Sequence, residues 1–209
     1  NTYMGPVWSK PLATGADLVV YSATKFIGGH SDLIAGAVMA KGELMVRVKT
    51  LRTFLGNMVS PHTAWLLLRS LETLKIRMEQ QCRNAQEVAK YLNTHEKVSK
   101  VHYLGLIPEG TKQHEIYKRQ YNSPGAMISF DIIGGEKAAF SFLNKLKLVK
   151  LAVSLGSTES LAQHPQTMTH CGIEPEARER MGVTEDLVRL SIGVEDANDI
   201  IYDIKQACG

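Results

Sequence analysis

A lysine and two hydroxyl side chains stand together directly after a short apolar run near the start of the chain. Residues 18–20 are Leu-Val-Val, and an apolar run of this kind, closed by turn residues, predicts a buried strand. Ser22, Thr24 and Lys25 follow it, and residues 28–29 are both glycine. The three polar side chains are therefore expected at the exit of a strand, where an open sheet places its ligand crevice.

These residue types suit one particular kind of ligand. A lysine amine at a strand exit can form a Schiff base with a carbonyl compound. Hydroxyl groups one and three residues before the lysine can hold a phosphate through hydrogen bonds. An aldehyde that carries a phosphate describes pyridoxal 5′-phosphate (PLP). Taken alone, however, a Ser-x-Thr-Lys segment is more often a polar surface turn. Other segments of the chain are therefore needed to distinguish a cofactor site from a surface turn.

The segment from Ser22 to Asp32 (Ser-Ala-Thr-Lys-Phe-Ile-Gly-Gly-His-Ser-Asp) closely resembles the cofactor-lysine signature of the Cys/Met-metabolism, or trans-sulfuration, PLP-dependent enzymes. Further blocks resemble the same family in the expected order over nearly the whole chain: residues 60–62, 154–156, 162–165, 168–170 and 187–196. This resemblance favours the cofactor lysine over the surface turn.

The resemblance implies a role for each polar residue at the predicted strand exit. Lys25 matches the lysine that forms the Schiff base with PLP and later moves protons at Cα and Cβ of the substrate. A free lysine amine has a pKa of about 10.4, so burial and nearby positive charge would have to lower that pKa for it to act at neutral pH. Ser22 and Thr24 match the hydroxyls that bind the phosphate, and the structural alternative for both is stabilisation of a turn.

Three residues in the C-terminal half match the substrate-binding positions of the family. Arg189 lies on the polar face of an otherwise apolar predicted strand, and a guanidinium suits a carboxylate bidentately. It matches the arginine that grips the α-carboxylate of the amino-acid substrate, and a structural salt bridge is the alternative. Ser154 matches the residue that helps to place that carboxylate. Thr169 is expected to support the substrate-binding residues without contacting the substrate itself.

The resemblance also implies a reaction, that of a PLP-dependent carbon–sulfur lyase acting on sulfur amino acids. Val153 is apolar where cystathionine-handling members often carry an acidic residue. The chain is therefore more similar to members that cleave methionine by γ-elimination into 2-oxobutanoate, ammonia and methanethiol. One segment departs from those members: residues 51–53 are Leu-Arg-Thr, whereas the matching segment of those members is similar to Leu-Lys-Asp. Cystathionine γ-lyase, cystathionine γ-synthase and O-acyl-homoserine sulfhydrylase activities stay open, as does an inactive fragment or oligomerisation module.

Apolar spacing predicts the elements that have to position these residues. Residues 33–39 are small, apolar and β-compatible, which predicts a second buried strand. Residues 42–55 carry apolar side chains three and four apart, which predicts a helix. A hydroxyl and a proline at residues 60–61 mark the start of another helix. Its apolar spacing runs to about His95, so we expect one long helix that bridges two domains, with the boundary near residue 76.

The C-terminal part alternates strands and helices. Strands are expected at residues 98–103, 126–133, 149–154 and 187–194, and helices around residues 114–121, 136–146, 175–181 and from Asp196 onward. These patterns predict an α/β fold. The resemblance makes residues 1–76 the C-terminal part of a PLP-binding large domain of the aspartate-aminotransferase-like type (fold type I). It makes residues 77–209 a smaller α+β C-terminal domain.

Composition and charge argue against several other classes of protein. The chain has 209 residues, 44% apolar and 22% charged, as is ordinary for a globular protein. The net charge is only +3 and the basic residues are spread out, so no nucleic acid partner is expected. No apolar stretch is long enough to cross a bilayer, so no membrane partner is expected. The histidines and the three cysteines show no metal-ligand or paired spacing, which predicts no metal site and reduced thiols in a cytoplasmic protein.

The first residues of the chain carry a further expectation from the family. The family segment that resembles Asn1-Thr2 is directly preceded by the aspartate that pairs with the PLP pyridine nitrogen. The phosphate-cradling glycine loop and the stacking tyrosine lie upstream as well. We therefore expect the chain to be the C-terminal portion of a longer enzyme and to be inactive without the missing N-terminal part. The resemblance also implies a homo-oligomer, a tetramer built as a dimer of dimers, in which two subunits complete each active site.

Overall fold

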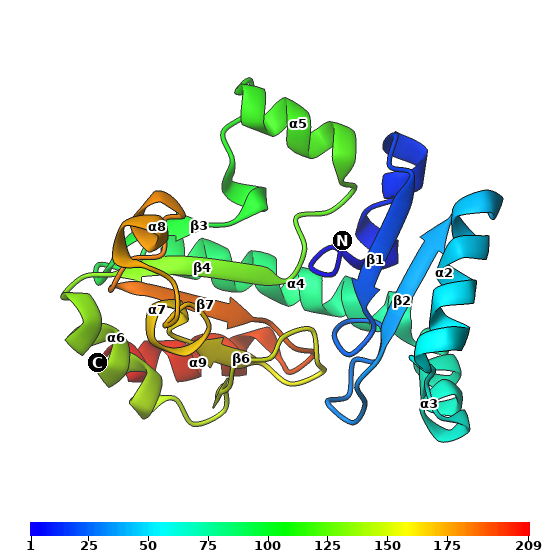
Figure 1. Cartoon of the computed structure of the whole chain (residues 1–209). Helices are drawn as coiled ribbons and strands as arrows, with labels where there is room; N and C mark the ends of the chain where they lie inside the picture. The colour runs from blue at the N-terminus through cyan, green and yellow to red at the C-terminus, as the bar shows by residue number, and fades with distance from the viewer.

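The computed structural model describes all residues from Asn1 to Gly209 (Figure 1). The N-terminal part contains a small antiparallel sheet of two strands, β1 and β2. The elements of this part are α1 (Gly5–Trp8), the 3₁₀ turn η1 (Pro11–Thr14), β1 (Leu18–Ser22) and β2 (Gly36–Ala40). The strand predicted at residues 18–20 is confirmed, but of these residues only Val19 is buried, since Leu18 and Val20 are exposed. The strand leads directly into the turn that carries Lys25.

The second strand begins later than the predicted residue 33. Thr24 ties the residue before β2 to the lysine turn: its backbone N–H donates to the Ala35 carbonyl at 3.1 Å, and the Ala35 N–H donates to Thr24 Oγ1 at 3.0 Å. Ala35 therefore belongs to the turn, and regular pairing with β1 begins only with Gly36 opposite Ser22.

Two helices, α2 (Gly42–Leu55) and α3 (Pro61–Glu72), follow the small sheet. The predicted start of α3 is confirmed, because Ser60 Oγ accepts a hydrogen bond from the backbone N–H of Thr63 at 3.1 Å. The predicted helix at residues 42–55 is confirmed as well and ends at Gly56 in the left-handed conformation. None of the residues of α2 is fully buried: Met45 and Val48 are half-buried, whereas Leu51, Phe54 and Leu55 are exposed.

The expectation of one continuous helix from Pro61 to about His95 is wrong. The structure has two helices, α3 and α4 (Leu74–Asn93), which meet at Thr73. Side chains bind the Ser70 carbonyl at this junction: Arg77 NH2 donates to it at 3.0 Å and Thr73 Oγ1 at 3.4 Å. In a continuous helix this carbonyl is an acceptor for the next turn, so the side-chain bonds accompany the break.

The C-terminal part is built on a five-stranded sheet with the order β3-β4-β7-β6-β5. All neighbours are antiparallel except β5 and β6, which are parallel. The strands are β3 (Val98–His102), β4 (Met127–Ile132), β5 (Lys150–Leu151), β6 (Leu161–Gln163) and β7 (Leu187–Ser191). The predicted strand at 149–154 is thus reduced to two residues, and β6 lies in a stretch for which the sequence pattern predicts no strand or helix.

Helices cover one face of this sheet (Figure 1), and α4, α6 and α9 form that layer. The remaining helical elements are η2 (Leu104–Leu106), α5 (Lys112–Gln120), α6 (Gly135–Lys145), α7 (Pro165–Met168), α8 (Pro175–Arg180) and α9 (Ala197–Cys208). The main core between the sheet and the helices also includes Trp8 and Phe26, whose rings meet edge to face at 5.6 Å. Phe26 follows Lys25, so the lysine turn is packed into the core of the C-terminal part.

No helix of the structure has both the length and the apolar character needed to cross a membrane.

Candidate active site

Lys25 lies in a tight turn at the end of β1. Its N–H donates to the Ser22 carbonyl at 3.2 Å, and its own carbonyl accepts from the Gly29 N–H at 2.7 Å. Gly29 has φ +71°, a conformation that favours glycine. The neighbouring Phe26 side chain is only 1% exposed, so the turn is anchored on the inner side while the lysine amine stays half-buried at the surface.

The structure brings Lys25, Ser154 and Arg189 together although they are far apart in the sequence. Lys25 Nζ donates to Ser154 Oγ at 3.1 Å. Arg189 NH2 donates to the backbone carbonyls of Val153 and Ser154, both at 3.1 Å. Ser154 therefore contacts both basic side chains, one through its hydroxyl and one through its carbonyl.

Neither basic group has a carboxylate partner. The chain forms three ion pairs, Lys75–Glu79, Lys90–Glu87 and His102–Asp131, and none of them includes Lys25 or Arg189. Burial lowers the pKa of the Lys25 amine, and the nearby positive charge of Arg189 lowers it further. Both effects favour the neutral amine, which is the form that acts as a nucleophile or base.

Arg189 is held by its place on β7. The residues on either side of it, Val188 and Leu190, are fully buried in the core, so Arg189 projects from the opposite face of the sheet. Burial lowers the pKa of its guanidinium, and the nearby Tyr3 phenol opposes that shift. The two carbonyl bonds of Arg189 both use NH2, so its other N–H groups face the Tyr3 phenol or a ligand.

Ser22 and Thr24 flank the lysine but differ in their hydrogen bonds. Ser22 is half-buried, and its N–H donates to Thr2 Oγ1 at 2.9 Å while its hydroxyl forms no hydrogen bond within the chain. The Thr24 hydroxyl donates to the Ala35 carbonyl at 3.3 Å, in addition to accepting from the Ala35 N–H. Ser22 thus offers a free donor for a phosphate oxygen, whereas Thr24 would have to turn its O–H away from Ala35.

Thr169 forms no hydrogen bond with Lys25, Ser154 or Arg189. Its hydroxyl accepts from Gln163 Nε2 at 3.1 Å, and Gln163 on β6 is the register partner of Arg189 on β7. Thr169 therefore reaches the arginine only through an intervening side chain, which agrees with a supporting position and not with direct contact to a substrate.

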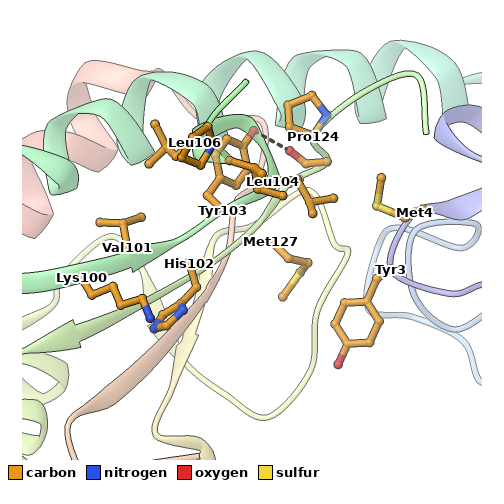
Figure 2. A pocket seen from close by; sticks show the side chains of 14 residues that line it. Tyr3, Met4, Lys100, Val101, His102, Tyr103, Leu104, Leu106, Pro124 and Met127 are labelled. Atoms are coloured by element: carbon orange, nitrogen blue, oxygen red, sulfur yellow. Dashed lines mark hydrogen bonds between the residues drawn. The ribbon is translucent and has the colours of Figure 1, made fainter. Parts of the chain in front are cut away.

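A cavity of about 600 Å³ adjoins this region, between β3, the loop before β4 and the N-terminal segment. Figure 2 shows Lys100 and His102 on one side of it, Tyr3 on the other and Met127 between them. The Tyr103 hydroxyl donates to the Gly125 carbonyl at 3.0 Å, and this hydrogen bond joins two residues that line the cavity. Tyr3 borders the cavity and also lies near Arg189, so this residue is common to the cavity and the surroundings of the basic pair.

The arrangement fits a carbonyl-bearing cofactor together with an anionic substrate. A half-buried amine with a lowered pKa can bind an aldehyde, and the free Ser22 hydroxyl lies three residues before it. Arg189 presents unpaired donors to a carboxylate. No group of three or more His, Cys, Asp or Glu side chains lies close enough to hold a metal ion, and all three cysteines are free thiols.

Sequence reasoning missed Tyr3 and Gln163. Tyr3 carried no signal, because a tyrosine in an irregular N-terminal segment has no recognisable partner in the sequence. Gln163 is 1% exposed, and its Oε1 has no hydrogen-bond partner in the chain. No strand is predicted at β6 from the sequence pattern, so the register that places Gln163 beside Arg189 could not be predicted.

Known proteins are similar to this chain over its whole length. The family model for Cys/Met metabolism PLP-dependent enzymes matches residues 1–209. The chain is 48% identical over 208 residues to an L-methionine γ-lyase of Fusobacterium nucleatum subsp. polymorphum and 45% identical over 209 residues to that of Pseudomonas putida. It is 42% identical to a cystathionine β-lyase of Lactococcus lactis subsp. cremoris. These matches cover 99% of the chain but 52–54% of each relative, so the chain spans about half the length of the curated relatives it matches.

Solved structures agree with the sequence matches. A cystathionine γ-lyase from Micromonospora echinospora superimposes with a TM-score of 0.94 at 39% identity, covering 100% of this chain and 54% of that one. A cystathionine γ-synthase from Xanthomonas oryzae pv. oryzae, in complex with aminoacrylate and cysteine, gives a TM-score of 0.94 at 42% identity with the same coverage. The fold is therefore shared by lyases and a synthase.

The electrostatic coupling of the basic pair can be measured directly. Arg189→Gln removes the positive neighbour of Lys25, so the pKa of the Lys25 amine should rise towards its ordinary value. The rate at which an amine-reactive reagent modifies Lys25, followed by peptide mass spectrometry as a function of pH, should then show its midpoint at higher pH. Arg180→Gln, the same charge change at an exposed position of α8, should leave the midpoint unchanged. Equal midpoints for the two variants would contradict the coupling.

Proposed function

We propose that this chain, which belongs to the family of Cys/Met metabolism PLP-dependent enzymes, is part of a carbon–sulfur lyase that acts on sulfur amino acids. The observation that supports the proposal best is the pair of basic side chains, Lys25 and Arg189, which meet at Ser154 without any carboxylate to neutralise them. Such a pair suits a ligand that brings both a carbonyl group and negative charge.

PLP is the cofactor of this family and, when bound, supplies an electron sink that stabilises negative charge at the substrate Cα. Lys25 is the residue that would hold its aldehyde carbon, and the Ser22 hydroxyl would donate a hydrogen bond to its phosphate. Thr24 is proposed as a second phosphate donor, which requires its O–H to leave the Ala35 carbonyl.

Arg189 and Ser154 position the substrate. The guanidinium receives the α-carboxylate, because it is half-buried on a rigid strand and lacks an acidic partner. The Ser154 hydroxyl accepts from Lys25 Nζ and keeps its own O–H available to the same carboxylate. Binding of the carboxylate by Arg189 and Ser154 would place the substrate Cα–H bond near the Lys25 amine, which also contacts Ser154. Thr169 is proposed to support this binding through Gln163, which steadies the strand next to Arg189.

Lys25 moves the protons. An amine that is not bonded to the cofactor would be free to exchange protons, and burial together with the charge of Arg189 lowers its pKa, which favours the neutral form. Nζ can then take the proton from Cα and deliver it elsewhere on the substrate, which is the general acid–base role. The neighbouring charge of Arg189 prevents the amine from retaining the proton too strongly.

Within the class of lyases, we propose methionine as the substrate. A γ-elimination converts L-methionine and water into methanethiol, ammonia and 2-oxobutanoate. The apolar Val153, which precedes Ser154 and is half-exposed, supports an apolar substrate side chain over a second charged group. Relatives named L-methionine γ-lyase support the same choice, whereas relatives and structures named for cystathionine keep the cystathionine activities as the competing outcome.

The substrate proposal predicts the preference of the intact enzyme that contains this chain. Methanethiol release from methionine should have a higher kcat/KM than 2-oxobutanoate or pyruvate release from cystathionine. A reversed preference would replace methionine γ-lyase by a cystathionine lyase, and no turnover of either without an added thiol acceptor would favour a synthase or sulfhydrylase. Retention of neither activity nor cofactor would favour the inactive module.

The role of Arg189 predicts a binding defect. Arg189→Lys in the intact enzyme keeps the positive charge but loses the bidentate fork, so KM for the amino acid should rise roughly 10- to 100-fold, as expected for losing a hydrogen bond to a charged group worth about 1.5–3 kcal/mol. The exposed Arg180→Lys serves as the control. An unchanged KM would remove Arg189 from the substrate site.

The intact enzyme is proposed to be a homo-oligomer, a tetramer built as a dimer of dimers. Exposed large apolar side chains gather on α2 and α3, including Leu51, Phe54, Leu55, Trp65 and Leu68. Such a set calls for cover, which the rest of the same subunit or a partner subunit would provide in the intact enzyme. Light scattering of the intact enzyme should give four times the subunit mass, and a monomer mass would contradict the assembly.

A further inference from the structure

Arg77 on α4 is buried to 6% exposure, yet it binds no carboxylate. Its NH1 donates to the Phe26 carbonyl at 3.0 Å, and its NH2 donates to the carbonyls of Ile27 at 3.3 Å and Ser70 at 3.0 Å. Its Nε donates to Thr73 Oγ1 at 3.2 Å. Every nitrogen of the guanidinium is therefore bonded to the lysine turn or to the junction of α3 and α4.

A buried cation without an anion is costly, so its hydrogen bonds have to be well placed. Three backbone carbonyls and one hydroxyl satisfy this guanidinium instead of a counter-charge. A residue that only filled space on α4 would be apolar, as its neighbour Met78 is. The arginine thus has a directional role, which is to join the turn after Lys25 to the break at Thr73.

The shape of the turn matches this arginine. A Cβ atom at Gly29 would overlap the Arg77 guanidinium, so only glycine leaves room for it. On the opposite side, the Gly29 carbonyl accepts from the Thr158 N–H at 3.0 Å, and Ser31 Oγ donates to Glu159 Oε1 at 2.9 Å. The turn is therefore held between α4 and the loop of residues 154–160, which also carries Ser154.

We propose that Arg77 is a positioning residue for Lys25: by binding the carbonyls of the two residues that follow the lysine, it fixes the turn so that the amine points to Ser154. The inference rests on the proposed function, because it assigns Arg77 to the turn of the cofactor lysine. The effect is transmitted through the backbone, since Arg77 donates to no atom of the Lys25 side chain.

Three variants of the intact enzyme test this role. Arg77→Met removes all four hydrogen bonds while keeping an unbranched side chain of similar length. Arg77→Lys retains one charged donor and can reach only part of the carbonyl set. Arg83→Met is the matched control, because Arg83 lies on the same helix, is exposed and binds only Gln80 Oε1.

Two readouts separate positioning from general stability. The first is the steady-state rate: Arg77→Met should lower kcat about 10²-fold, as expected when a reacting group is misplaced by about 1 Å, and should change KM little because Arg189 is untouched. The second needs no bound cofactor: in the cofactor-free protein, the pH midpoint for modification of Lys25 by an amine-reactive reagent should rise, because a loosened turn lets water reach the amine. Arg77→Lys should lie between Arg77→Met and the parent enzyme in both readouts.

The inference is overturned if a folded Arg77→Met, or a folded Arg77→Lys where the methionine variant does not fold, matches Arg83→Met in kcat and in the Lys25 midpoint. Lys25→Ala separates this failure from failure of the proposed function. If Lys25→Ala abolishes cofactor binding while the Arg77 variants behave like the control, only the positioning role is lost. If Lys25→Ala retains the cofactor and the activity, the proposed function itself is wrong.

Discussion

The structure depends on two basic side chains that lie next to each other without an anion between them. Lys25 and Arg189 come from different parts of the chain and share Ser154, and the charge of Arg189 adds to burial in lowering the pKa of the Lys25 amine. A protein gains nothing in stability from such a pair, because burial and like charge both oppose it. The pair is explained once a carbonyl cofactor and a carboxylate substrate are placed there, since each of them removes one part of the electrostatic cost.

Keeping the two groups in this relation requires support from both parts of the fold. The position of Arg189 follows from the alternation of side chains along β7, because Val188 and Leu190 on the other face of the strand are buried in the core. Lys25 is set by a turn whose inner side chain, Phe26, packs in that same core. The loop of residues 154–160 contacts both, through Ser154 and through the Thr158 N–H bond to Gly29. The site is therefore a product of how the lysine turn docks on the five-stranded sheet.

Local patterns predicted the elements that carry the chemistry, and they did so where one physical signal dominated. The apolar run at residues 18–20, the cap at Ser60 and the alternation around Arg189 all reappear as β1, α3 and β7. The break at Thr73 could not be predicted, because no glycine or proline marks it and the bonds that accompany it come from the Arg77 guanidinium. The family resemblance placed Lys25, Ser154 and Arg189, and the structure shows them in contact. Arg77 did leave a signal, a charged residue on the apolar stripe between Leu74 and Met78, but the bonds that it makes are visible only in three dimensions.

The most direct test of the account is the position of the cofactor on the chain. The intact enzyme, incubated with PLP, should be reduced with borohydride, digested with trypsin and analysed by mass spectrometry. The account predicts a pyridoxyl adduct on the peptide that contains Lys25, together with loss of tryptic cleavage after that residue. An adduct on a different lysine, or no adduct at all, would contradict it.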